Sequence, residues 1–174
     1  MKKENFFKAV SLVALFVVFG CAPQSPLEQK IQARTAVSFE MWKREALTKL
    51  EAPERKAFDD AVQELRFRIT AKGIASGSDP VDEALRVEID GKKTRDVILD
   101  GLETKLTRLS YDRDEMNRII SSNSRLKTKP GDDDSAAVLS DSRDRQKKAR
   151  DNLEAEIATV KAQLARLRQP VEKA

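Results

Sequence analysis

The chain reads TRDVILDGLETKLTRLSYDRDEMNRII from Thr94 to Ile120, and this stretch decides the fold. Large apolar residues recur in it at alternating intervals of four and three residues, which is the spacing of a heptad repeat. The series consists of Ile98, Leu102, Leu106, Leu109, Arg113, Met116 and Ile120. Arg113 is its one polar member. The spacing predicts a long helix with one narrow apolar stripe, which needs a second helix to pack against.

A second stretch with the same spacing lies in the C-terminal part of the chain. Its members are Gln146, Ala149 or Arg150, Leu153, Ile157, Val160, Leu164 and Leu167. The residues between the two stretches are rich in serine and contain Pro130-Gly131, which break helices. Two helices joined in this way pack antiparallel. We therefore predict an antiparallel, coiled-coil-like helical hairpin over residues 92–170, with a polar tip loop at 121–135 and a tail at 171–174.

Residues 38–91 predict a small bundle of short helices in front of the hairpin. Apolar residues recur there at helical spacing in three segments, the first with Ser38 as its candidate N-cap, and glycines follow the second and third segments. Nearly all aromatic residues beyond position 20 lie in this part, which favours a compact core there. Residues 21–37 are expected to form a tether or a first helix, since Ser25 to Glu28 has the form of a capping box. The predicted fold class is all-α.

The N-terminus has the order of residues that is typical of an export signal. Three lysines precede an apolar run that ends directly before Cys21, the only cysteine of the chain. About 12 apolar residues are too few for the roughly 20 that a spanning helix needs. We therefore interpret residues 1–20 as a signal peptide. A buried free thiol is the alternative interpretation of Cys21.

The sequence Val18-Phe19-Gly20-Cys21 resembles the lipobox of bacterial lipoprotein precursors. The resemblance implies that the Cys21 thiol is alkylated with diacylglycerol and that acyl chains hold the protein at a membrane. Several acyl chains together give stable anchoring, whereas one chain does not. Ala22 stands where an aspartate would suggest retention in the inner membrane, so the resemblance favours the inner leaflet of the outer membrane, facing the periplasm.

Composition argues against several classes of function. The chain has 33 basic and 29 acidic residues, and removal of residues 1–20 leaves 30 and 28, so nucleic acid is not an expected partner. The chain has no histidine and its one cysteine is expected to carry lipid, so we predict no metal, no cofactor and no enzymatic activity. The acidic run Asp132 to Asp134 lacks the ligand spacing of a calcium loop. We expect it to cap the following helix, with Asp134 or Ser135 as the N-cap.

Three aromatic residues, Phe39, Trp42 and Phe67, are candidate contacts for a partner, because buried aromatic residues dominate interface energies. Their alternative role is to form the core of the module. The function we expect is that of a noncatalytic binding or scaffold module in the cell envelope, with another envelope protein as its partner.

The alternative is a structural coiled-coil lipoprotein that self-associates as a homo-oligomer and contacts peptidoglycan. Lys173, near the end of the sequence, resembles the lysine through which small outer-membrane lipoproteins are joined to peptidoglycan. The resemblance implies a possible covalent attachment to the cell wall.

Overall fold

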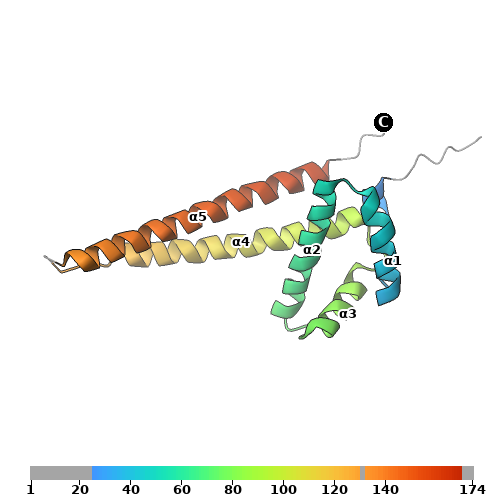
Figure 1. Cartoon of the computed structure of the whole chain (residues 1–174), viewed down its shortest axis with the longest axis horizontal. Helices are drawn as coiled ribbons and strands as arrows, with labels where there is room; N and C mark the ends of the chain where they lie inside the picture. Colours follow the sequence, from blue (N-terminus) through green and yellow to red (C-terminus); the bar gives the residue numbers. More distant parts are fainter. Residues whose placement is uncertain (1–24, 130–131, 170–174) are drawn as a thin grey trace, which may run out of the picture.

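The structure is a computed structural model that describes residues 25–129 and 132–169. Its elements are a 3-10 turn η1 (Pro26–Glu28), α1 (Ala36–Ala46), a second 3-10 turn η2 (Leu47–Lys49), α2 (Ala52–Ala71), α3 (Ser78–Ile89), α4 (Thr94–Ser124) and α5 (Asp133–Arg168). In Figure 1, α4 and α5 run side by side as a long hairpin, and α1, α2 and α3 gather at one end of it. The predicted all-α class and the helical hairpin are confirmed.

The hairpin is held together by the two apolar stripes and by ion pairs between the helices. In its base, Leu102 and Leu109 of α4 and Ile157 and Val160 of α5 are buried. Lys105 pairs with Glu156 across the two helices, with 2.7 Å between Nζ and Oε1. The heptad spacing in the sequence therefore corresponds to the face that each helix turns toward the other.

Both hairpin helices extend further into the predicted tip loop than expected. Helix α4 ends at Ser124, and α5 begins at Asp133, directly after an N-cap formed by Asp132, whose carboxylate accepts a hydrogen bond from the Ser135 amide. The Arg143 guanidinium donates to the carbonyl oxygens of Asn123 and Leu126, and so satisfies acceptors that the end of α4 leaves free. The loop is shorter because these side chains bond the backbone at the helix ends.

The core lies where the three short helices meet the base of the hairpin. Trp42 of α1 packs against Phe58 of α2 with 5.5 Å between ring centroids and stacks on Phe39 at 6.1 Å. The same cluster of buried residues continues through Val97 and Ile98 of α4. The hairpin base thus contributes to the core that the sequence assigned to the first half of the chain.

Helices α2 and α4 approach each other very closely where they cross. Gly101 of α4 lies against Ala61 of α2, and a Cβ atom built on Gly101 would lie 2.3 Å from the Ala61 Cβ. Both residues are buried. Two small residues facing each other therefore set how closely the module can pack on the hairpin.

Residues 29–33 are neither a helix nor a free tether, which corrects the expectation for the described part of residues 21–37. They run as an extended segment against the turn between α3 and α4. The Ile31 amide donates to the Lys92 carbonyl at 2.9 Å, and the Gly91 amide donates to the Ile31 carbonyl at 2.9 Å. Ile31 is 1% exposed, and burial of its side chain gives this segment the energy to pack.

The sequence placed most helix ends to within a few residues. Gly73 and Gly91 follow α2 and α3 with φ values of +66° and +75°, which suit glycine. The N-cap of α1 is Thr35 and not Ser38. Ser38 occupies the third helical position, where the side chains of both residues bond reciprocally to backbone amides. The predicted cap was wrong because Ser38 is the distal half of a capping box.

Candidate functional site

The structure separates the three aromatic residues that were predicted as partner contacts. Phe39 and Trp42 are 7% and 4% exposed and belong to the core, so the folded protein cannot offer them to a partner. Phe67 is 51% exposed on α2. The aromatic prediction is therefore corrected for two residues, which took the alternative role of packing, and Phe67 remains as a surface residue.

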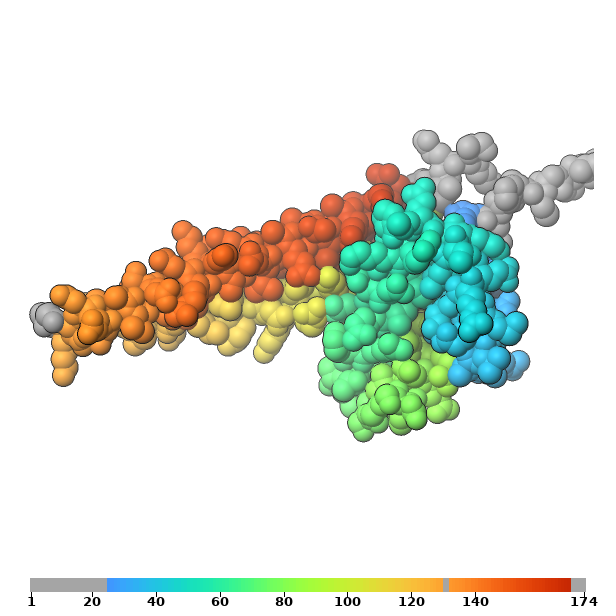
Figure 2. All heavy atoms as spheres, in the orientation of Figure 1, coloured from blue at the N-terminus to red at the C-terminus, as the bar shows by residue number. Residues whose placement is uncertain are grey.

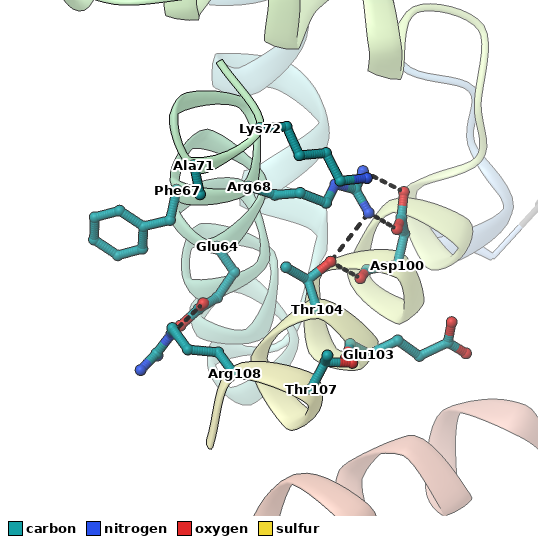
Figure 3. A pocket seen from close by; sticks show the side chains of 10 residues that line it. All are labelled: Glu64, Phe67, Arg68, Ala71, Lys72, Asp100, Glu103, Thr104, Thr107 and Arg108. Atoms are coloured by element: carbon teal, nitrogen blue, oxygen red, sulfur yellow. Dashed lines mark hydrogen bonds and ion pairs between the residues drawn. The ribbon is translucent and has the colours of Figure 1, made fainter. Parts of the chain in front are cut away.

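Phe67 borders a groove between α2 and α4 with a volume of about 520 Å³ (Figure 3). One wall comes from Glu64, Phe67, Arg68, Ala71 and Lys72, and the other from Asp100, Glu103, Thr104, Thr107 and Arg108. Within each wall the residues recur at three- and four-residue steps, so they share one face of their helix. In Figure 3 the Phe67 ring projects to the opposite side from the Arg68 side chain.

Arg68 is the centre of a polar cluster at one end of the groove. Its Nη1 donates to Asp100 Oδ1 at 2.5 Å and to Thr104 Oγ1 at 3.1 Å, and its Nη2 contacts Glu88 of α3. One guanidinium thus joins α2, α3 and α4. Desolvation by burial would raise the pKa of Asp100, but hydrogen bonds and charge from Arg68 outweigh it and lower that pKa below its usual range.

A second ion pair closes the other end of the groove. Arg108 donates from Nε and Nη2 to both carboxylate oxygens of Glu64, at 3.0 and 2.5 Å. The hydrogen bonds that Arg108 donates to the Glu64 carboxylate raise the pKa of the Arg108 guanidinium, which therefore stays charged. Glu64 is 6% exposed, and this bidentate pairing is what makes burial of its carboxylate tolerable.

Four of the charged residues that line the groove form ion pairs within the protein. Arg68, Arg108, Glu64 and Asp100 are engaged with one another, and the Thr104 hydroxyl donates to the Asp100 carbonyl of its own helix. Groups paired in this way stabilise the crossing of α2 and α4. Beside these ion pairs the groove exposes the apolar surface next to Phe67.

The part of the chain that the structure describes contains no cluster of metal-ligating side chains and no membrane-spanning helix. Among residues 25–129 and 132–169, no group of three or more carboxylate, histidine or cysteine side chains is placed to hold a metal ion. Within the same ranges, no helix is long and apolar enough to span a bilayer. Cys21, residues 1–20 and Lys173 lie outside the described residues.

Comparison of the chain with protein-family models, with curated proteins and with solved structures finds no match.

Sequence reasoning did not single out Glu64, Arg68 or Arg108. They flank the apolar stripes of their helices, where charged residues are usual, and only the crossing of α2 over α4 brings them together. The small residues Ala61 and Gly101 were the one sequence feature that could have indicated this crossing, because small residues within two amphipathic helices permit close approach.

Proposed function

We propose that the protein is a lipid-anchored, periplasm-facing lipoprotein that acts as a noncatalytic binding or scaffold module of the cell envelope. The lipobox-like sequence ending at Cys21 supports the anchor, and it stands four residues before Ser25, where the described structure begins. The long hairpin supports a scaffold, since the 36 residues of α5 extend over about 54 Å.

The observation that carries the binding role is the half-exposed Phe67 beside the groove between α2 and α4. A phenylalanine buries a large apolar area when covered and so contributes strongly to association. The partner that fits is another envelope protein that places an apolar side chain in the groove, against Phe67. The fixed ion pairs at both ends of the groove would then set the partner's orientation.

Photo-crosslinking in cells tests this role. A benzoylphenylalanine replaces Phe67 in one strain and Tyr111 in another, because Tyr111 is a comparably exposed aromatic on α4, at 64%. We expect a crosslinked envelope protein from position 67 and not from position 111. Equal adducts from both positions, or none from position 67, would contradict the groove as the binding surface. Labelling with palmitate, with Cys21→Ser as the control, tests the anchor separately.

The second candidate function is self-association through the hairpin. The observation in its favour is that the half of the hairpin beyond Leu109 and Ile157 contains no fully buried residue among those described, while Tyr111, Ile119 and Val138 are exposed. A second hairpin could cover these side chains. Light scattering on the purified protein decides between the two functions, since a monomer removes self-association and a crosslink from position 111 to a second copy supports it.

A further inference from the structure

The outer face of α1 exposes two large apolar side chains next to each other. Val37 and Met41 are 69% and 67% exposed, and they are four residues apart, so they lie one turn from each other. Phe39, Trp42 and Ala46 form the opposite, buried face of α1. An exposed apolar pair on a helix whose other face is fully packed has no role in the core of this protein.

Three unpaired basic residues lie in α1 or in the segment that leads into it. Lys30, Arg34 and Arg44 are exposed and form no ion pair or side-chain hydrogen bond within the part of the chain that the structure describes.

Both acidic residues of α1 form ion pairs with lysines. Glu40 pairs with Lys43 at 2.6 Å, and Glu45 pairs with Lys49 at 2.8 Å. Residues 30–49 hold five basic and two acidic residues, so α1 and the segments that flank it carry a net positive charge beside the exposed apolar pair. This composition is typical of helices that lie in the interface of an anionic membrane.

Helix α1 also lies where a lipid anchor would place a membrane. In Figures 1 and 2 it forms the end of the molecule that is farthest from the hairpin tip. Residues 29–33 are bonded to the α3–α4 turn, so only the short stretch between Cys21 and Ser25 separates the proposed lipid from the folded module. Four residues span at most about 14 Å.

We infer that the outer face of α1 docks on the surface of an anionic bilayer, with Val37 and Met41 in the interfacial region and Lys30, Arg34 and Arg44 against phosphate headgroups. The inference rests on the proposed lipid anchor at Cys21. Docking through α1 holds the module flat against the membrane and directs the hairpin tip away from it.

Fluorescence quenching on the lipidated full protein tests this inference. The protein is reconstituted in vesicles of phosphatidylethanolamine and phosphatidylglycerol, with a single thiol introduced by Val37→Cys or by Val87→Cys. Val87 is the matched control, because it is 77% exposed on α3. Cys21 carries a thioether in the lipidated protein and does not react with the probe. An environment-sensitive fluorophore on each thiol is then exposed to spin-labelled lipids.

We expect a blue-shifted emission and strong quenching by spin-labelled lipid at position 37, and neither at position 87. A cation near an anionic surface contributes about fivefold to the docked-to-undocked ratio, so Arg34→Gln and Arg44→Gln should each weaken the quenching at position 37 by reducing this ratio about fivefold.

Three results would overturn the inference. Equal quenching at positions 37 and 87 in lipidated protein overturns it and leaves the proposed function standing. A blue shift at position 37 without quenching by lipid indicates that a second copy of the chain covers α1. Absence of lipid on Cys21, seen by mass spectrometry of the same sample, overturns the proposed function together with the docking.

Discussion

The substitution Gly101→Ala tests the close crossing on which the arrangement of module and hairpin depends. The added methyl group would lie 2.3 Å from the Ala61 Cβ, 2.4 Å from its Cα and 2.7 Å from its carbonyl oxygen. Ordinary van der Waals contact begins at 3.4 Å. To lengthen the Cβ–Cβ distance from 2.3 to 3.4 Å, α2 and α4 must separate by about 1.1 Å. Two of the three neighbouring atoms belong to the main chain, so a side-chain rotation cannot relieve the overlap.

The magnitude follows from two opposing effects. Overpacking a well-packed interface costs about 1–3 kcal/mol, and alanine in place of glycine within a helix stabilises by about 1 kcal/mol. Because main-chain atoms are involved, we take the upper end of the first range and expect a net loss of about 2 kcal/mol, which for a chain of this length lowers the Tm by about 4–8 °C.

Urea unfolding followed by circular dichroism measures this loss in the free energy of unfolding, and fluorescence of Trp42, the one tryptophan, reports on the module core. The control is Asn117→Ala, an exposed position of the same helix, where the better helix propensity of alanine should leave stability unchanged or slightly higher. A Gly101→Ala protein that unfolds at the same urea concentration as the parent would refute the argument from close approach.

Three further predictions concern the polar contacts. The pKa of Asp100 is lower in the folded protein than its unfolded value of about 3.9, so the contribution of Asp100 to stability is present above about pH 4 and is lost as the pH falls through the folded pKa. Asp100→Asn should therefore flatten the acid side of the plot of urea midpoint against pH. An unchanged slope would count against the ion pair. Arg108→Ala leaves the buried Glu64 carboxylate unpaired and should cost about 1–3 kcal/mol in urea unfolding, whereas Arg118→Ala, which removes an exposed pair on the same helix, should cost less than about 1 kcal/mol. Equal losses for the two arginines would contradict the assigned difference in burial. Thr35→Ala removes the N-cap of α1 and should cost about 1 kcal/mol in the same assay; a loss near zero would show that the capping box does not stabilise α1.

The sequence was sufficient to predict the helices because the forces that define them act between near neighbours in the chain. Heptad spacing, Gly73 and Gly91 all operate within a few residues, so the hairpin and the stops of α2 and α3 could be derived without knowledge of the tertiary structure. The predicted helix starts differ from the observed ones where several neighbouring side chains could have capped the helix. Thr35 in place of Ser38, and Asp132 in place of Asp134, are both of this kind.

Contacts between distant residues were harder to derive. The packing of Ile31 against the α3–α4 turn depends on a segment about 60 residues further along the chain, and a short apolar segment with no periodicity gives no indication of its partner. The groove was missed for the same reason, because its walls come from α2 and α4, and the small residues Ala61 and Gly101 permit a close approach without specifying which helices cross. Phe67 could be listed as an aromatic, but whether it would be buried could not be predicted.

Stability is distributed unevenly along the hairpin, and this bears on where the protein can bind. At its base, α4 packs against both α2 and α5, so Leu102 and Leu109 are nearly inaccessible to solvent. Toward the tip each helix has only the other as a neighbour, and Arg143 of α5 donates to backbone carbonyls at the end of α4 instead of closing an apolar layer. Regions with few buried apolar contacts open most readily, and surfaces that adapt to partners are drawn from such regions. The well-packed base therefore holds the groove and α1 in fixed positions, while the distal half is the part whose packing a second copy of the chain could complete.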